Sequence, residues 1–440
     1  MALQRSVRRC ICPGSGRFLM IKALDDANLP LEGNIMSKTK LSIFSSILLG
    51  SVFALTGAGT AMPGKHDPSN LRGAHAAHLA DRFGENRSAR PHTQAAGSKI
   101  RRPVLLDPSF KIIDEPDADP TLYGTRVFGI NEKGQLSGQY VDSDGAFHAF
   151  LATPNGDNTF TFAPITVKHG DTFSGFLNDN GEVFGTYNDR HTGIENTWIR
   201  KPNGKIETVI IGSEGTIGQG LNNKGVLVGD YVDDNGAMRG FIRDKSGTIT
   251  YFDVPNAGTG EGQGTNPIGI DEHGDVSGIV IDADNVLHGF IRKADGTYEA
   301  PIDIAGAGTG EFEGTAAIEV DDKGWLTGGY VDSNDVSHGF IRNPQGKVAI
   351  VDPPDAGTGQ FQGTVEVEHR EAGWAIGEYI DNNDVYHGFF RDETKHITEF
   401  DPPGAGDLGT FTVYSSNRDH VIAGTFKDEN GIRHGFLRNP

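Results

Sequence analysis

A segment of about a dozen residues recurs along the chain and limits the folds that this chain can adopt. It reads VDSNDVSHGFIR at Val331 to Arg342, and close variants stand at Ile281 to Arg292 and at Ile380 to Arg391. Aligned on the last residue of the His-Gly-Phe triplet, the copies lie 43 to 50 residues apart, at Phe150, Trp198, Phe241, Phe290, Phe340, Phe389 and Phe436. Repetition at this period indicates a fold built from one small unit used many times.

Each unit contains four short segments separated by turn residues. The first ends in a turn such as NEKG (131–134), and the second alternates apolar and polar residues, as in GQLSGQYVD (134–142). The third holds the triplet, and the fourth is rich in threonine and apolar residues, as in GTITYFDVP (247–255). Alternating runs joined by Asp-Gly or Asn-Gly pairs are typical of β-hairpins. Four antiparallel strands per unit predict the blade of a β-propeller, and the 61 glycines fit its many tight turns.

The two ends of the repeat region predict how the ring closes. The last copy stops at HGFLRNP (434–440) without a fourth strand, while FKIIDEPDA (110–118) stands before the first copy and matches VAIVDPPDA (348–356). We therefore expect an all-β fold: a seven-bladed β-propeller of four-stranded antiparallel blades, in which the N-terminal strand joins the last blade and removes an open edge. A β-helix and an array of β-sandwiches are the alternative folds.

The first hundred residues differ from the repeats. From Met36 the chain shows two lysines, an apolar run from Leu41 to Leu55 and small residues up to Ala61, which is the pattern of a secretory signal peptide. We expect residues 1–35 to be an upstream extension, 36–61 a signal peptide, 62–103 a basic flexible leader and 104–440 the propeller. The alternative for the apolar run is a retained membrane anchor. Export predicts a secreted, periplasmic or cell-surface protein with no stable membrane span in its mature form.

Charge is unevenly distributed and excludes some classes of partner. Residues 1–61 carry 7 Lys+Arg and 3 Asp+Glu, a net charge of +4, and residues 62–103 carry 8 and 3, a net charge of +5. Because the whole chain has a net charge of −20, residues 104–440 carry −20 − 4 − 5 = −29. An acidic body of this charge would repel nucleic acid and anionic lipid surfaces. Both cysteines, Cys10 and Cys12, precede the predicted cleavage point, so the mature chain would contain no disulfide.

The histidine of the triplet is a candidate for chemistry, but its repetition favours a structural role. It recurs at His148, His288, His338, His387 and His434. Five copies around a ring cannot all meet one substrate, so we expect each histidine to donate a hydrogen bond within its own blade. Strand alternation places Phe340 on the same side as His338, where it would fill the space between blades, while Gly339 on the other side would let the next sheet approach.

The Asp-rich turns offer a second kind of candidate site. Asp142 and Asp144, and likewise Asp233 and Asn235, place oxygen atoms at the spacing that begins a calcium loop. The downstream bidentate glutamate of an EF-hand is absent, so only weak calcium binding is expected. The alternative is a hairpin turn stabilised by the aspartate side chain itself.

Departures from the repeat indicate two further places for function. Two residues before the first turn, three units have Gly129, Gly220 and Gly269, whereas the fifth and sixth have Glu319 and Glu368, with Glu366 and His369 nearby. Carboxylates gathered near the axis could act as general acid and base on a glycan or hold a cation. The second place is the AGTG links between blades, where we assign ligand contact to Thr259, Thr309 and Thr358. The alternative for the axial carboxylates is a solvated channel lining without a specific role. The alternative for the AGTG links is a loop that only connects the blades.

The repeats resemble those of the HAF family of extracellular bacterial repeat proteins. The resemblance covers about residues 104–440 and rests on a G-x-L-x-G-x-Y-x-D segment followed by His-Gly/Ala-Phe, as in His-Ala-Phe at 148–150. It implies secretion, but it transfers no site residue because the family's biochemical role is largely unassigned. The second unit departs from the pattern, with Thr197 and Trp198 in place of Gly-Phe.

Three functions are compatible with these observations. The sequence favours a secreted, monomeric, non-enzymatic binding module that contacts an extracellular protein or glycan through the face carrying the links and the Asp-rich turns, which we call the loop face. One alternative is an extracellular glycan hydrolase or lyase that uses the axial carboxylates, and another is a structural or adhesive cell-surface protein. No GxSxG, HExxH or CxxC motif supports serine-nucleophile or zinc-helix chemistry. No cofactor other than calcium is indicated.

Overall fold

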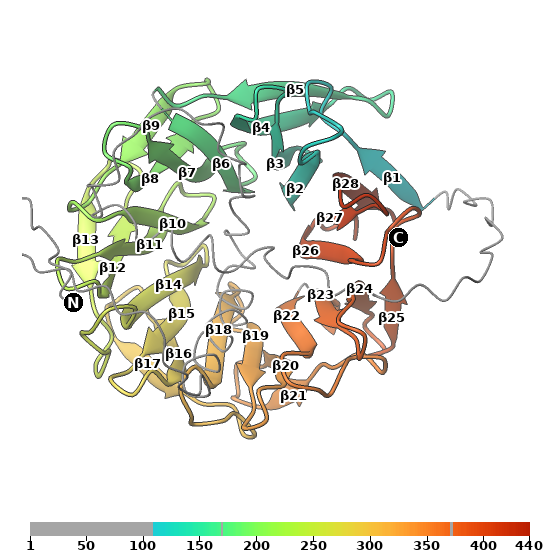
Figure 1. The fold of residues 1–440 in the computed structure, drawn as a ribbon. Helices are drawn as coiled ribbons and strands as arrows, with labels where there is room; N and C mark the ends of the chain where they lie inside the picture. The colour runs from blue at the N-terminus through green and yellow to red at the C-terminus, as the bar shows by residue number, and fades with distance from the viewer. Residues whose placement is uncertain (1–108, 169, 370–372) are drawn as a thin grey trace, which may run out of the picture.

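The protein is all-β in the computed structural model, which describes residues 109–168, 170–369 and 373–440, without the side chains of 412–414. No α-helix occurs within these ranges. The strands form four-stranded antiparallel sheets that stand around a central axis, as in a β-propeller (Figure 1). The predicted extension, signal peptide and leader lie outside the described residues, as do the first five residues of the predicted propeller.

The strands follow the predicted order within each unit. They are β2 (Thr125–Ile130), β3 (Leu136–Val141), β4 (Phe147–Pro154) and β5 (Phe160–Ile165); β6 (Gly170–Leu177), β7 (Val183–Asp189), β8 (Glu195–Arg200) and β9 (Ile206–Val209); β10 (Thr216–Leu221), β11 (Leu227–Val232), β12 (Met238–Arg243) and β13 (Ile249–Phe252); β14 (Gly264–Ile270), β15 (Val276–Ile281), β16 (Leu287–Arg292) and β17 (Tyr298–Ile302); β18 (Gly314–Val320), β19 (Leu326–Val331), β20 (Ser337–Arg342) and β21 (Val348–Ile350); β22 (Gly363–His369), β23 (Ala375–Ile380), β24 (Tyr386–Arg391) and β25 (Ile397–Phe400); and β26 (Thr410–Ser416), β27 (Ile422–Lys427) and β28 (Arg433–Arg438) with β1 (Phe110–Ile113). The units from β10 to β25 are also linked to one another by single parallel residue pairs, such as Met238 with Gly264, into one continuous 16-stranded sheet.

The N-terminal strand completes the sheet at the other end of the chain. β1 pairs antiparallel with β28, and Ile112 lies opposite Phe436. The first strand of the next sheet, β2, lies against this sheet: the Val127 N–H donates to Thr425 Oγ1 at 3.0 Å, and the Ile130 N–H donates to Ser415 Oγ at 3.0 Å. The predicted pairing of the two ends of the repeat region is therefore confirmed, and β28 has no free edge because β1 covers it.

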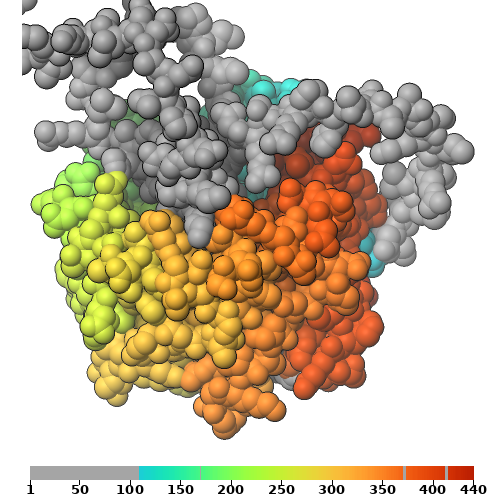
Figure 2. Space-filling model, turned by 60° about the horizontal axis from the view of Figure 1, so that its bottom comes forward, coloured from blue at the N-terminus to red at the C-terminus, as the bar shows by residue number. Residues whose placement is uncertain are grey.

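The recurring phenylalanine forms the core between sheets, as its position in the repeat predicted. All six copies and the equivalent Trp198 are fully buried. Phe340 packs with Ile291 and Ile302 of the preceding sheet as well as with Leu326 of its own. In the space-filling view the sheets from β14 onwards pack side by side into a continuous wall (Figure 2). A fully buried aromatic side chain of this kind contributes several kcal/mol to the stability of each contact between sheets.

The glycine of the triplet is needed for the close approach of the next sheet. A Cβ atom built on Gly339 would lie 2.3 Å from Val367 Cγ2, and one on Gly289 would lie 2.9 Å from Ala317 Cβ. In both cases the contacted residue belongs to the first strand of the following sheet. The predicted role of this glycine is confirmed because no larger side chain fits at that distance.

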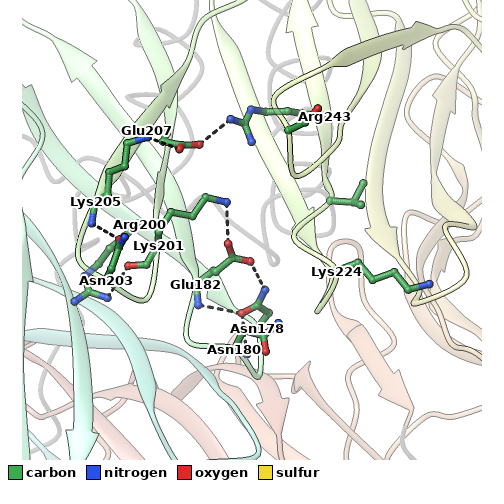
Figure 3. A network of polar contacts seen from close by, with 12 residues as sticks. Asn178, Asn180, Glu182, Arg200, Lys201, Asn203, Lys205, Glu207, Lys224 and Arg243 are labelled. Carbon is green, nitrogen blue, oxygen red and sulfur yellow. Dashed lines mark hydrogen bonds and ion pairs between the residues drawn. The ribbon is translucent and has the colours of Figure 1, made fainter.

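Ion pairs on the opposite side from the loop face also connect neighbouring sheets. Figure 3 shows Arg243, at the end of β12, reaching Glu207 on β9 of the preceding sheet, with their N and O atoms 2.8 Å apart. Arg342 contacts Glu299 on β17 in the equivalent way. We call this side the turn face, because it carries the turns between the first and second strands of each sheet. No helix among residues 109–168, 170–369 and 373–440 is long and apolar enough to cross a membrane.

Candidate functional site

Four of the five recurring histidines lie between two aspartates of their own sheet, and the fifth, His148, lies 2.7 Å from Asp142. His338 Nδ1 is 2.8 Å from Asp352 Oδ2, just after the fourth strand, and its Nε2 is 3.7 Å from Asp332 Oδ2, in the Asp-rich turn. His288, His387 and His434 have the same pair of partners, and Arg239 bridges Asp233 and Asp253 in the β10–β13 sheet. We call this arrangement the clasp. The predicted hydrogen bond within the blade is confirmed.

The clasp changes the ionisation of its members. The hydrogen bond to Asp352 raises the pKa of His338 against the effect of burial, and Asp401 and Asp114 do the same for His387 and His434. These histidines are therefore more readily protonated than a free imidazole, and each one, when protonated, forms an ion pair that connects the Asp-rich turn to the fourth strand.

In the predicted calcium loops, the carboxylates of Asp142 and Asp233 accept hydrogen bonds from their own turns and from the following strand. Asp142 Oδ1 accepts hydrogen bonds from the N–H groups of Asp144 and Ala146, both at 2.9 Å, and its Oδ2 lies 2.7 Å from His148 Nε2. Burial raises the pKa of Asp142, but these hydrogen bonds outweigh it and leave the pKa below its usual value. The turn around Asp233 and Asn235 has the same bonds, with Arg239 in place of the histidine. Calcium binding at these turns stays a prediction.

An open cleft of about 630 Å³ surrounds the clasp of the β22–β25 sheet on the loop face. It lies between the link that leads into this sheet, the Asp-rich turn after β23 and the end of β25. Its walls combine aromatic rings, amides and four carboxylates, and the lining residues are Pro354, Asp355, Tyr379, Asp381, Asn382, Asn383, His387, Glu399, Phe400 and Asp401.

The electrostatics of this cleft are dominated by its carboxylates. Burial and the negative charges of Glu399, Asp355 and Asp401 raise the pKa of the Tyr379 hydroxyl, which therefore remains a hydrogen-bond donor at any physiological pH. Asp401 raises the pKa of His387, which, when protonated, compensates for part of this negative charge. Asp381 and Asp401 already accept hydrogen bonds from their own turn, His387 and Thr410. Asp355 and Glu399 are therefore the carboxylates that can accept hydrogen bonds from hydroxyl or amine groups of a ligand, while the rings of Tyr379 and Phe400 offer an apolar surface.

The three threonines predicted to bind ligand are exposed and lie in three different links. The links are fixed to the Asp-rich turns: the Phe361 N–H donates to the Asp335 carbonyl at 2.7 Å, and Gln362 Nε2 donates to Asp384 Oδ1 at 3.0 Å. Thr259, Thr309 and Thr358 do not form one constellation, because each belongs to a separate pair of sheets. Thr358 borders the cleft, since its N–H donates to Asn382 Oδ1 at 3.2 Å.

A second cavity, of about 290 Å³, lies at the axis and is lined by the first strands of the sheets. Glu319, Glu366 and Glu368 all line it. The register irregularity of β22 falls between Thr364 and Glu366, so Glu366 lies directly opposite Glu378 on β23. Burial, followed by the charges of Glu378, Glu368 and Glu319, raises the pKa of Glu366 well above its usual value. The structure therefore brings the three predicted carboxylates together, although their role stays a prediction.

His369, the other residue predicted to act with these carboxylates, does not line the axial cavity. Its ring stacks on Trp325 at 4.8 Å between centroids, and its Nδ1 lies 3.8 Å from Asp321 Oδ2. Strand alternation explains the separation, because His369 follows Glu368 and points to the other side of β22.

Sequence reasoning missed the residues that distinguish the cleft. In the aligned units, Asp355 replaces Gly306 and Glu399 replaces Ile350, while the clasp itself is unchanged. Reading each link and fourth strand against its counterparts could have found both substitutions. Glu378 was also missed, because it faces Glu366 only through the register irregularity of β22.

No family model matches this chain, and no curated protein matches it. Among solved structures, a catalytically inactive variant of virginiamycin B lyase from Staphylococcus aureus with quinupristin is 13% identical, with a TM-score of 0.48, and the match covers 75% of this chain and 100% of that one. The BP39L lectin from Burkholderia pseudomallei is 10% identical over 68% of this chain and 98% of its own, with a TM-score of 0.38. The Aleuria aurantia lectin is 12% identical over 62% and 94%, with a TM-score of 0.38. The resemblance to HAF-repeat proteins stays a prediction.

Proposed function

We propose that this chain is a secreted, seven-bladed β-propeller, closed into a ring by β1, that binds a glycan in the cleft of the β22–β25 sheet. The observation that carries the proposal is the composition of that cleft, in which Tyr379 and Phe400 lie beside amide and carboxylate acceptors. Sugars present hydroxyl donors around an apolar ring face, so an aromatic surface flanked by acceptors complements them. The signal-peptide pattern at 36–61 supports export, and the pairing of β1 with β28 supports closure.

The charge of the cleft narrows the class of glycan. Asp355, Asp381, Glu399 and Asp401 place four carboxylates around one opening, against one histidine. An anionic glycan would be repelled, whereas a neutral or amino-substituted glycan would gain hydrogen bonds or ion pairs. We therefore propose glycans without carboxylate or sulfate groups as the ligands, with amino sugars bound most tightly.

A glycan array with the full-length chain tests this proposal. Retention of neutral or amino glycans should fall at least about tenfold in Asp355→Asn and in Glu399→Gln, because each change weakens an acceptor of the cleft. Glu393→Gln makes the same change of charge on the turn face of the same sheet and should leave retention intact. If no glycan is retained, or if all three variants retain glycans equally, the proposal is wrong.

The axial cavity supports a second candidate function, hydrolysis or lyase chemistry on a glycan. The observation in its favour is that Glu366, Glu368 and Glu319 line one cavity and that burial and the neighbouring carboxylates raise the pKa of Glu366, which suits a general acid, while Glu368 or Glu319 would act as a base. If this reading is right, Glu368→Gln abolishes turnover on a glycan panel without changing the thermal melt. Retention of intact glycans that survives Glu368→Gln would instead support the binding function.

A further inference from the structure

The first turns of several sheets are connected by a relay of amide side chains on the turn face. Asn131 Nδ2 donates to the Asn178 carbonyl at 3.0 Å, Asn178 Nδ2 to the Asn222 carbonyl at 2.9 Å, and Asn222 Nδ2 to the Asp271 carbonyl at 2.9 Å. Each bond joins one sheet to the next around the mouth of the axial cavity. The relay needs an N–H donor at each position, and Asn131, Asn178 and Asn222 supply one.

The next position of the relay is Asp271, which has a carboxylate where the preceding positions have an amide. Asp271 Oδ1 accepts hydrogen bonds from the N–H groups of Gly274 and Asp275 at 2.7 and 2.8 Å, just as Asn222 Oδ1 accepts from its own turn. Its Oδ2 therefore takes the place of the amide nitrogen, but an ionised carboxylate has no proton to donate to the next carbonyl. The Asp271 side chain is only 3% exposed, so water cannot freely replace the missing donor. Burial raises the pKa of Asp271, and a positive partner would offset the cost of keeping this carboxylate ionised.

Two further ligand atoms converge on Asp271 Oδ2. His273 Nδ1 lies 3.4 Å from it and 3.7 Å from Asp322 Oδ1, and all three atoms lie within 4.8 Å of one another. Asp322 is held in place because its Oδ1 accepts the Glu272 N–H at 2.7 Å. The three residues belong to the first turns of two neighbouring sheets, β14–β17 and β18–β21.

The separations of these atoms differ from those of hydrogen bonds. The clasp histidines lie 2.7–2.9 Å from their nearest aspartate, which is the length of a direct hydrogen bond. The edges of a tetrahedron of oxygen and nitrogen ligands at about 2.0–2.2 Å from Zn²⁺ are roughly 3.3–3.6 Å long. The two His273 distances lie close to that edge. The longer clasp distances of 3.5–3.9 Å do so too, but there the two aspartates face different ring nitrogens, whereas both aspartates here face His273 Nδ1.

From this geometry we propose that Asp271, His273 and Asp322 bind a divalent transition-metal ion of the zinc class and clip the β14–β15 turn to the β18–β19 turn. One imidazole and two carboxylates suit Zn²⁺ and its neighbours, whereas Ca²⁺ needs six or more oxygens. His273 and Asp322 are 66% and 50% exposed, so a water molecule can complete the coordination. The site is independent of the proposed glycan cleft, which lies on the opposite face.

Zinc titration of the chelator-treated full-length chain by calorimetry, with metal counted after dialysis, tests the site. The wild type should bind one more equivalent of Zn²⁺ than Asp271→Asn or His273→Asn. Loss of a supporting residue around a metal typically costs 10- to 100-fold in affinity, so loss of a direct ligand should cost at least about 100-fold. His396→Asn, which removes an exposed turn histidine elsewhere, is the matched control. The four histidines between residues 62 and 103 could also bind zinc. Because they are present in the wild type and in every variant, they do not affect the difference in the number of zinc ions bound.

The thermal melt adds a readout that separates metal binding from folding. Zn²⁺ should raise the melting temperature of the wild type but not that of Asp271→Asn. In chelator, Asp271→Asn should melt no lower than the wild type, because its amide can restore the relay as Asn222 does. Equal zinc equivalents in the wild type and both variants would overturn the site. Stabilisation by Ca²⁺ equal to that by Zn²⁺, and lost in Asp271→Asn, would overturn the assignment to a transition metal.

Discussion

The β18–β21 and β22–β25 sheets share their clasp and differ in what surrounds it. His338 and His387 lie 2.8 Å from equivalent aspartates, and Phe340 and Phe389 are equally buried. The first sheet, however, presents Gly306 and the exposed Ile350 where the second presents Asp355 and Glu399. The same scaffold thus carries an acidic cleft in one place and an apolar edge in the other. Residues that recur hold the sheets together, and residues that depart from the repeat determine what each sheet can bind.

The largest expected effect tests the shared scaffold. Phe340→Ala and Phe389→Ala should each lower the free energy of unfolding by about 3–5 kcal/mol, because each leaves a cavity between two sheets. Urea unfolding followed by tryptophan fluorescence measures both. A cost below about 1 kcal/mol in either variant would show that the recurring phenylalanine is not the core of that sheet.

A second experiment replaces a residue of the β22–β25 cleft with its counterpart from the β18–β21 sheet. Glu399→Ile gives the β22–β25 sheet the residue of its neighbour and should weaken glycan retention at least about tenfold, which corresponds to about 1.4 kcal/mol. Stability should change by less than about 0.5 kcal/mol, because the position lies at the surface. Calorimetry with a retained glycan measures the affinity, and a thermal melt measures the stability. Unchanged affinity would remove Glu399 from the site.

Glu366 lines the axial cavity, whereas Ala317, the residue of β18 that aligns with it in sequence, packs in the core between sheets, and this provides a third contrast. The pKa of Glu366 is raised in the folded chain, so the unfolded chain releases its proton first and stability falls as the pH rises above the unfolded value. Glu366→Gln should therefore raise the free energy of unfolding at pH 8 by on the order of 1 kcal/mol and have little effect at pH 4. Urea unfolding at both pH values checks this, and a uniform loss of stability would contradict it.

The smallest effect concerns the clasps themselves. The pKa of His338 and that of His387 are raised on folding, so their stabilisation is complete below the unfolded pKa of about 6.5 and is lost as the pH rises through the folded value. His338→Gln and His387→Gln should each cost at most about 1 kcal/mol at pH 5.5, because the groups are partly exposed, and less at pH 9. Thermal melts across this range would show whether the two clasps are equivalent. A cost that does not depend on pH would exclude the ion pair.

Much of the fold could be predicted from the sequence because the repeat displays its own strand order. The spare strand at Phe110 and the truncated unit ending at Pro440 indicated their pairing, and the alternation around His338 indicated which side chains face the core. The cleft could not be predicted in this way, because it combines a link, a turn and a fourth strand that meet only in space. Glu366 faces Glu378 through a register irregularity that leaves no signal in the pattern of residues. The metal site also depends on spatial proximity, since Asp322 belongs to the next unit.

Hydrogen–deuterium exchange with and without a retained glycan compares the β18–β21 and β22–β25 sheets in one sample and shows which residues contact the ligand. The account predicts slower exchange on binding at 354–355, 379–383 and 399–401, with no change at the equivalent 305–306, 330–334 and 350–352. Equal protection of both sheets would mean that the recurring clasp, rather than the residues that depart from it, forms the binding site. Protection confined to residues outside both sheets would likewise contradict the account.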